Sequence, residues 1–263
     1  MPAPPSLPAA LLGHAAADPE EPWLFRAEGW DWKWHPWKEL AGWMEGWAER
    51  LADSPSDRPP GARAAFLYRS DPESVILDLA LQAAGLTSAP VLERGEEPLW
   101  IEPSPPAPPS GRPLETEPGG AVVGNGEWSA AELVAVGERL REVIQPQGKR
   151  EIVVLGGSLQ DPVERTMLAW ATLTGTAVVL EPNPALRAAT AAWVRPTVFH
   201  GSPEEIAELR RSVKKVRKGR LPFRRLRTLL AVGEMAAEDA AFWEGQGVSI
   251  ATPFAAERHN HGI

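Results

Sequence analysis

The chain has 263 residues, enough for one large domain or two small ones, and 43% hydrophobic with 24% charged residues is typical of a globular protein rather than a disordered one. Its formal net charge of −8 argues against nucleic acid as the main partner, and the absence of cysteine excludes disulfides, thiolate metal sites and thiol catalysis. No apolar run approaches the roughly 20 residues of a membrane span, and no basic residue precedes the apolar start of the chain. We therefore expect a cytoplasmic protein without a transmembrane segment or a signal peptide.

The N-terminal part begins with a Pro/Ala-rich stretch at 1–21, which we interpret as a flexible arm. Period-two alternation then predicts a β-hairpin with strands at 23–27 and 30–34 and three Trp on one face of the second strand. Apolar residues at spacings of three and four predict an amphipathic helix over 37–51. The Trp residues of this region favour core packing over a ligand platform.

A first β-α-β unit follows the hairpin and its helix. An apolar run at 64–68 predicts a buried strand, and Asp71 with Pro72 marks the start of a helix that runs to about residue 84, where Gly85 ends it. A second strand is expected at 87–92. Seven prolines between 102 and 118 indicate a linker.

The rest of the chain alternates regularly between helices and strands. We expect helices at 129–145, 162–174, 184–193, 203–218 and 236–246, and strands at 151–155, 176–180, 196–199, 226–232 and 247–251. Such alternation indicates an α/β fold, a mostly parallel sheet with helices on both faces. The expected organisation is an arm (1–21), a first unit (22–101), a linker (102–118) and an α/β subdomain (119–263).

Several segments, in this order, resemble the adenylate-forming (AMP-binding) acyl-CoA synthetases, and most of all the long-chain ones. They are 37–40 (WKEL), 62–92, 164–166 with 175–179 (ERT, GTAVV), 195–203 (RPTVFHGSP) and 242–248. The segment at 195–203 is the most specific, because it matches the family's R-P-T-x-x-x-G-V-P nearly letter for letter. The resemblance implies part of the family's N-terminal domain, which binds ATP and the carboxylate. The family's enzymes convert a carboxylate and ATP to an acyl-adenylate and then transfer the acyl group to CoA, with a smaller C-terminal domain that supplies a lysine.

The sequence departs from this family at the residues that do the chemistry. The family's Ser/Thr/Gly-rich phosphate loop and its lysine are missing, and no lysine occurs between Lys38 and Lys149. The family's metal-binding glutamate aligns with Arg258, and the chain stops at Ile263, before the lysine-bearing domain. We therefore predict a pseudoenzyme: a regulatory, binding or partner subunit without catalytic residues or a metal site. The alternatives are an active acyl-adenylating ligase, the N-terminal half of a split one, or a structural or interaction protein that only reuses the fold.

If a ligand site is retained, it should lie at the carboxyl ends of the strands, where α/β proteins bind ligands. The candidate residues there are His200, Gly201, Ser202, Gly233, Thr252 and Phe254, and the candidate ligands are ATP, AMP and acyl-CoA. Residues 156–158 (GGS) also follow a strand, and we favour a tight turn over an anion site for them.

The segment 210–227 carries ten Lys/Arg and no Asp/Glu. It is either a solvated helix face or a docking surface for an acidic partner or an anionic membrane surface, through Arg210, Arg211, Lys214, Lys215, Arg217 and Lys218. Because the sheet would end at an open edge, we also expect a homo-oligomer or a partner chain.

Overall fold

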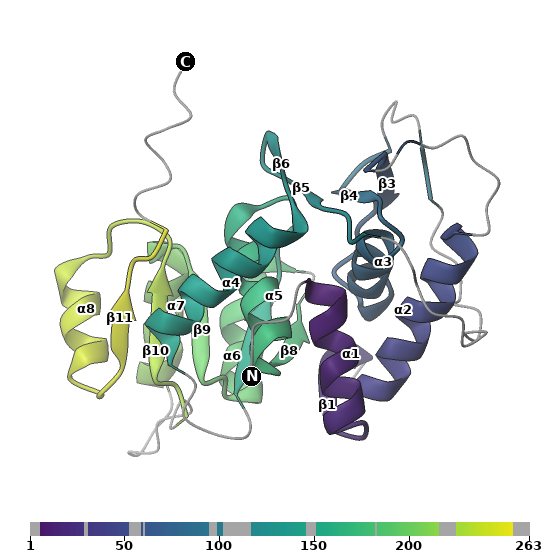
Figure 1. The fold of residues 1–263 in the computed structure, drawn as a ribbon. Coiled ribbons are helices and arrows are strands. Elements are labelled where there is room, and N and C mark those ends of the chain that lie inside the picture. Colours follow the sequence, from purple (N-terminus) through teal and green to yellow (C-terminus); the bar gives the residue numbers. More distant parts are fainter. Residues whose placement is uncertain are drawn as a thin grey trace.

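The structure is a computed structural model that describes residues 6–28, 31–52, 59, 61–94, 99–101, 117–145, 151–181, 183–215 and 225–254. These residues form two β-sheets with helices between and beside them (Figure 1). The helices are α1 (Leu7–Ala17), α2 (Trp37–Ala52), α3 (Pro72–Ala83), α4 (Ala130–Ile144), α5 (Pro162–Thr174), η1 (Pro184–Leu186), α6 (Arg187–Val194), α7 (Pro203–Lys215) and α8 (Ala237–Glu244). The strands are β1 (Pro22–Glu28), β2 (Asp31–Pro36), β3 (Arg63–Leu67), β4 (Thr87–Val91), β5 (Ala121–Val123), β6 (Gly126–Trp128), β7 (Ile152–Leu155), β8 (Ala177–Leu180), β9 (Val198–Gly201), β10 (Thr228–Ala231) and β11 (Ser249–Ala251).

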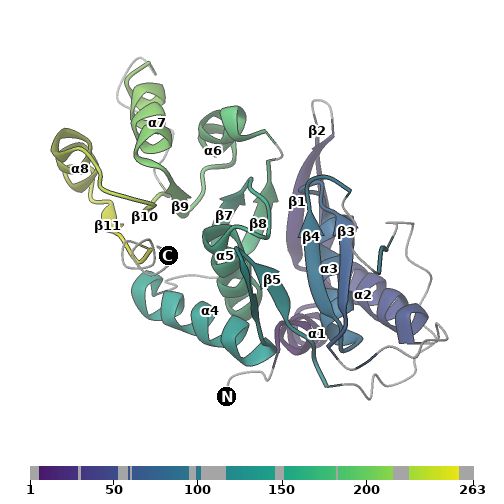
Figure 2. The ribbon, with the colours of Figure 1, turned by 90° about the horizontal axis from the view of Figure 1, so that it is seen from above.

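The larger sheet has seven strands in the order β11-β10-β9-β7-β8-β1-β2. All neighbours pair in parallel except β1 and β2, which form the antiparallel hairpin expected from the sequence. Helices α6, α7 and α8 cover one face of this sheet, and α4 and α5 lie on the other (Figure 2). The predicted fold class, a mostly parallel sheet with helices on both faces, is confirmed.

The smaller sheet has four strands in the order β3-β4-β5-β6. Its parallel pair β3 and β4, joined by α3, is the predicted β-α-β unit, and Asp71 caps α3 by accepting a hydrogen bond from the Ser74 N–H at 2.7 Å. The short antiparallel pair β5 and β6 was not predicted. Gly124 lies in the turn between these strands with a φ of +59°, a conformation that favours glycine.

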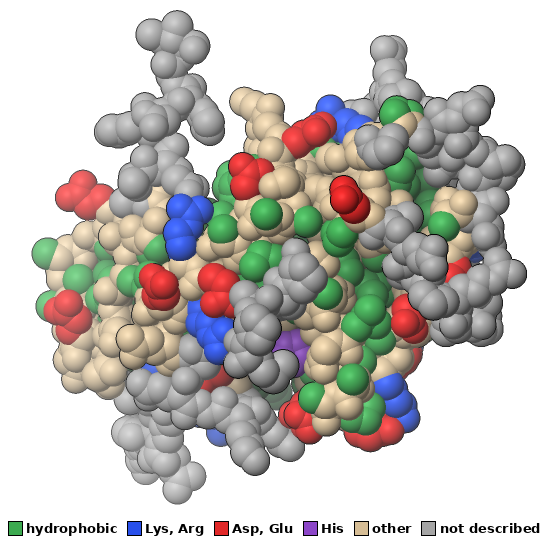
Figure 3. All heavy atoms as spheres, viewed as in Figure 1, with side chains coloured by type: hydrophobic (Ala, Val, Ile, Leu, Met, Phe, Trp, Pro, Cys, Tyr) green, Lys and Arg blue, Asp and Glu red, His purple; other side chains and the backbone are tan. Residues whose placement is uncertain are grey.

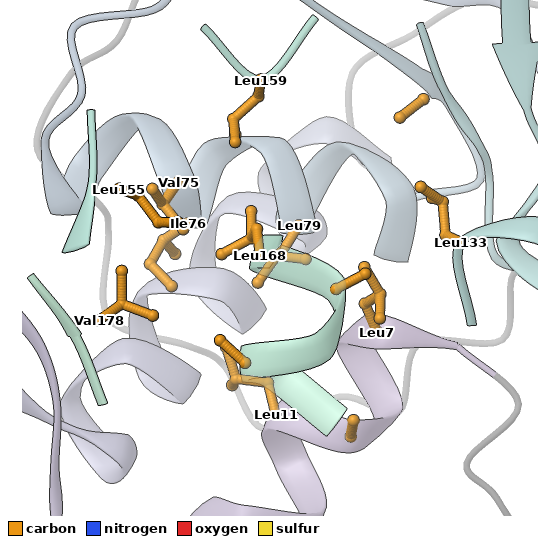
Figure 4. Close-up of a cluster of buried hydrophobic side chains, with 14 of the residues drawn as sticks. Leu7, Leu11, Val75, Ile76, Leu79, Leu133, Leu155, Leu159, Leu168 and Val178 are labelled. Carbon is orange, nitrogen blue, oxygen red and sulfur yellow. The ribbon is translucent and has the colours of Figure 1, made fainter. Parts of the chain in front are cut away.

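The main hydrophobic core lies where the helices α1, α3, α4 and α5 meet the strands of the larger sheet (Figure 4). Figure 4 shows Leu11 of α1, Leu79 of α3 and Leu168 of α5 pointing into one cluster with Val178 of β8. A second core, around Phe199 and Trp243, fills the space under α6, α7 and α8. Both faces of the larger sheet are therefore packed, which explains its nearly continuous apolar strands.

The expectation of a flexible arm at 1–21 is wrong for residues 7–17, which form α1. Ser6 caps this helix, since its hydroxyl accepts a hydrogen bond from the Ala9 N–H at 3.2 Å. Leu7 and Leu11, one turn apart, are buried against α3 and α5. A helix with so few polar residues lacks an amphipathic pattern, and its stability comes from this burial rather than from its own periodicity.

Other predicted helices and strands are present in the structure, but their first and last residues differ from the prediction. The expected helix at 184–193 begins as the 3₁₀ turn η1 and continues as α6, and the strand expected at 196–199 lies at Val198–Gly201. Most of the proline-rich linker, 102–116, and the predicted helical residues 216–218 lie outside the described residues. None of the helices in the described ranges is both apolar enough and long enough to cross a membrane.

The Trp residues serve two environments. Trp23 and Trp37 are buried and stacked, with ring centroids 4.3 Å apart, and Trp47 is buried on α2, so core packing is confirmed for these three. Trp32 and Trp34 on β2 are instead 36% and 51% exposed. The third Trp expected on that face, Trp30, lies outside the described residues.

A fully buried ion pair joins the two layers. The Arg165 guanidinium of α5 donates to both carboxylate oxygens of Asp78 on α3, at 2.5 and 2.9 Å. Asp78 also accepts hydrogen bonds from the Ser88 hydroxyl and the Gln82 amide. The pair thus ties the β-α-β unit of the smaller sheet to a helix that packs on the larger one.

Replacing Asp78 with Ala should destabilise the protein by about 3–5 kcal/mol, because the Arg165 guanidinium would stay buried without its counter-ion. Urea unfolding followed by Trp fluorescence measures this change. Glu138→Ala is the matched control, since it breaks the exposed Glu138–Arg141 pair and should cost less than about 1 kcal/mol. Equal costs for the two variants would contradict a special role for the buried pair.

Candidate functional site

The six candidate ligand residues lie at the carboxyl ends of three neighbouring strands. His200, Gly201 and Ser202 lie at the end of β9, Gly233 follows β10, and Thr252 and Phe254 follow β11. The structure nevertheless divides them between two places. The His200 side chain turns into a buried polar cluster, whereas Phe254 lines a separate pocket.

We call the buried polar group the strand-end cluster. Its members come from the ends of β8 and β9 and the first turns of α5, α6 and α7, and they are Glu164, Glu181, Arg187, His200 and Glu205. All five are buried except Glu205, whose side chain is 27% exposed.

Arg187 lies at the centre of the strand-end cluster. Its Nη1 is 3.1 Å from Glu205 Oε1 and 3.5 Å from Glu164 Oε1, and its Nη2 donates to the His200 carbonyl oxygen at 3.0 Å. The His200 Nε2 is 3.0 Å from both Arg187 Nη2 and Glu164 Oε1. His200 is therefore held by ionic neighbours of its own chain.

The carboxylates of the cluster occupy the backbone donors at three successive strand ends. Gly156 donates its N–H to Glu164 at 3.3 Å, and Ser202 donates to Glu205 at 2.8 Å. At the end of β8, Asn183 donates to Glu181 at 3.0 Å. Free backbone N–H groups at such positions could bind a phosphate, and here internal carboxylates take that role.

Glycines make room for these side chains. A Cβ on Gly156 would lie 2.7 Å from Arg187 Cδ, and a Cβ on Gly157 would lie 2.6 Å from Glu164 Cγ. Residues 156–158 therefore lead from β7 towards α5 in close contact with charged side chains, and no larger residue fits at Gly156 or Gly157 without a shift of these neighbours.

Two carboxylates, those of Glu164 and Glu205, lie against the Arg187 guanidinium, and Glu164 also lies against His200. The Glu181 carboxylate instead accepts hydrogen bonds from Thr190 and Asn183. Burial raises the pKa of Glu164, but His200, Arg187 and the Gly156 N–H outweigh it and lower that pKa to about 2. Within the described residues, His200 Nδ1 and Arg187 Nε have no hydrogen-bond partner. No group of three or more potential metal ligands occurs among these residues.

The pocket that Phe254 lines has a volume of about 260 Å³ and lies between α4, α5 and the segment after β11. Five of its seven lining residues are apolar, and Arg139 is the cationic one among them. The lining residues are Val136, Arg139, Leu140, Val143, Thr166, Pro253 and Phe254. Of the six candidate residues, only Phe254 contributes to this pocket.

The basic segment is partly neutralised where the structure describes it. Arg210 pairs with Asp239 at 2.7 Å and with Glu238, and Arg211 pairs with Glu208. The Lys214 and Lys215 side chains, and all of Arg217 and Lys218, lie outside the described part of the chain. Figure 3 shows acidic and basic side chains interspersed on the face it presents.

No protein-family model matches the sequence, and no curated protein is similar to it at the sequence level. Solved structures do match. The nonribosomal peptide synthetase FmoA3 in its AMPPNP-bound form has a TM-score of 0.74 and 14% identity over 95% of this chain and 31% of that one. The chain has the fold of the adenylate-forming ligases.

Other structures with this adenylate-forming fold match over nearly the whole chain. A fatty acyl-adenylate ligase from L. pneumophila, in complex with acyl adenylate and pyrophosphate, gives a TM-score of 0.69 at 11% identity over 93% of this chain and 53% of its own. The N-terminal domain of FACL13 from Mycobacterium tuberculosis gives 0.70 at 12% identity, over 93% of this chain and 74% of its own. The chain thus spans 31% of the FmoA3 chain and 53% of the L. pneumophila chain, so it matches only part of these two proteins. Sequence identities this low support the same fold for this chain, but they do not show that its individual residues have the same chemical roles.

Sequence reasoning found His200 but missed the cluster that surrounds it. Glu164 stands out in the sequence only through the family resemblance, and no motif singles out Arg187 or Glu205. The available signal was a charged residue at the start of each helix that follows a buried strand. Which of these charges meet could not be seen in the sequence, because their partners are 13 to 36 residues away.

The cluster should make the protein sensitive to acid. Because the folded-state pKa of Glu164 lies below its ordinary value, its contribution is complete above about pH 4.5 and falls as the pH drops towards 2. Glu164→Gln should lower the free energy of unfolding at pH 7 by about 3 kcal/mol and flatten its decline between pH 4.5 and 2.

Urea unfolding at a series of pH values measures both effects. Glu208→Gln, which changes an exposed glutamate of α7, is the control and should keep the wild-type slope. An unchanged acid slope in Glu164→Gln would show that the Glu164 carboxylate does not carry this stability.

Proposed function

We propose that this chain is a non-catalytic relative of the adenylate-forming ligases that binds a ligand without adenylating it. The observation that carries this proposal is the strand-end cluster. Glu164, Glu181 and Glu205 occupy the backbone N–H groups of Gly156, Asn183 and Ser202. At the ends of these three strands, the positions that could receive a nucleotide phosphate are filled by the chain itself.

Electrostatics support this proposal. Adenylation concentrates negative charge on a polyphosphate, and enzymes stabilise that charge with positioned cations and N–H donors. The carboxylates of Glu164 and Glu205 beside the single guanidinium of Arg187 disfavour such a charge, and the burial of Glu164 strengthens its repulsion because water screens it less. The lack of any lysine between Lys38 and Lys149 points the same way.

The pocket beside Phe254 suggests what is bound instead. Its apolar walls suit a hydrocarbon chain, and Arg139 can pair with a carboxylate. At about 260 Å³ it is slightly smaller than pockets for drug-sized ligands, which span roughly 300–1,000 Å³. We therefore propose a short or medium-chain carboxylic acid as ligand, in keeping with the acyl adenylate present in the L. pneumophila structure.

Decanoate at about ten times its dissociation constant should raise the melting temperature by about 3–5 °C, since binding then adds about 1.4 kcal/mol. ATP and AMP should produce no shift. Arg139→Gln should weaken decanoate binding about tenfold through loss of the charged hydrogen bond. Arg141→Gln, on the same helix but outside the pocket lining, should bind as the wild type does.

The proposal also predicts no carboxylate-dependent ATP–pyrophosphate exchange by this chain. Robust exchange by the purified protein would overturn the non-catalytic assignment and favour an active ligase. Exchange that appears only after a second chain is added would favour half of a split enzyme. Failure of decanoate to bind, with no exchange, would refute the acyl ligand alone.

A further inference from the structure

Strand β2 forms one edge of the seven-stranded sheet and exposes two Trp side chains. β1 is its partner on one side, and within the described residues no strand pairs with its other side (Figure 2). Trp32 and Trp34 are 36% and 51% exposed. Lys33, which lies between them, and Asp31, which precedes them, are also exposed. No other described strand therefore covers the edge from 31 to 34.

The two Trp side chains share one face of the sheet. Trp34 lies opposite Phe25 and Trp32 opposite Ala27 in the antiparallel pair, and directly opposed residues point to the same side. Phe25 packs against the core under α6, α7 and α8. The exposed Trp residues thus extend a buried apolar face beyond the last helix that covers it.

An open strand edge can add another strand. In an antiparallel pair, alternate residues direct their backbone N–H and C=O groups away from the partner, so half of those of β2 face solvent. Natural proteins protect such edges from pairing, and large exposed aromatic residues do the opposite. At the other edge of this sheet, β11 has only three residues and exposes no large hydrophobic side chain.

We propose that β2 pairs with β2 of a second copy of this chain, antiparallel about a two-fold axis centred on Trp32. In this register the two Trp32 residues oppose each other, and Asp31 of each copy lies opposite Lys33 of the other. Two opposite-charge pairs and one aromatic pair then form across the junction, and the seven-stranded sheet continues into the second copy.

Charge selects this register over its neighbour. Pairing centred on Lys33 would place the two ammonium groups directly opposite each other, which is destabilising. Lys33 now lies 3.6 Å from Glu28 of its own chain, but both side chains are about half exposed and such a pair contributes little. Lys33 can therefore leave its ion pair with Glu28 and pair with Asp31 of the second copy at a small cost in free energy.

The contact is small, because only four residues of each strand are exposed. Stable interfaces bury about 1,600 Å² in total, and a short strand edge falls below that. The predicted dimer is therefore weak and forms at concentrations of about 10–500 µM, held by main-chain hydrogen bonds and the Trp side chains.

Single charge reversals test the register directly. Asp31→Lys places lysines opposite lysines in its own dimer, and Lys33→Asp places aspartates opposite aspartates, so each variant alone should dimerise at least about tenfold more weakly. An equimolar mixture restores two opposite-charge pairs in the mixed dimer. Sedimentation equilibrium should therefore show association recovered in the mixture.

Trp32→Ser should also weaken the dimer about tenfold, whereas Trp193→Ser, which removes an 82% exposed Trp from α6, should leave it unchanged. All four substitutions are at exposed positions, and unchanged thermal melts would confirm folding. The proposal is overturned if the wild type stays monomeric at about 500 µM. It is equally overturned if the mixture fails to recover association, or if Trp193→Ser weakens association as much as Trp32→Ser.

Discussion

The buried ion pair between Arg165 and Asp78 is the interaction on which the arrangement of the two sheets depends. Arg165 belongs to a helix packed on the larger sheet, and Asp78 belongs to the crossover helix of the smaller one. Both side chains are fully buried and bidentate, so neither layer can shift without exposing an unpaired charge to an apolar core. Apolar packing alone would tolerate small sliding movements, whereas this geometry does not.

The same helix couples this junction to the strand ends. Glu164 and Arg165 are adjacent in sequence, and adjacent residues point about 100° apart around a helix. Arg165 therefore reaches α3, while Glu164 reaches His200 and Arg187 at the edge of the larger sheet. One turn of α5 thus fixes both the interlayer contact and the charged cluster that fills the strand ends. A ligand site at that edge would have to displace the cluster.

The distribution of Trp shows why side-chain type alone does not determine role. Trp23 and Trp37 stack within the core, where α1 and α2 cover them. Trp32 and Trp34 belong to the adjoining strand and share a face with Phe25, which packs in the other core, yet both remain 36% and 51% exposed at the sheet edge. Position in the sheet order, rather than local sequence, separates a packing residue from a candidate contact residue.

The sequence by itself determined the elements whose burial repeats with a regular period. Apolar spacing predicted α2, Asp71 and Pro72 placed the start of α3, and the residues 162–174 gave α5 with its observed ends. The sequence did not predict α1, because that helix is too uniformly apolar to show a period. It did not predict β5 and β6 either, because these strands are too short. Only the tertiary structure decided that His200 meets Glu164 and that Arg165 meets Asp78. Such pairs join residues 36 and 87 positions apart, and nothing in local periodicity encodes which distant charges will be buried together.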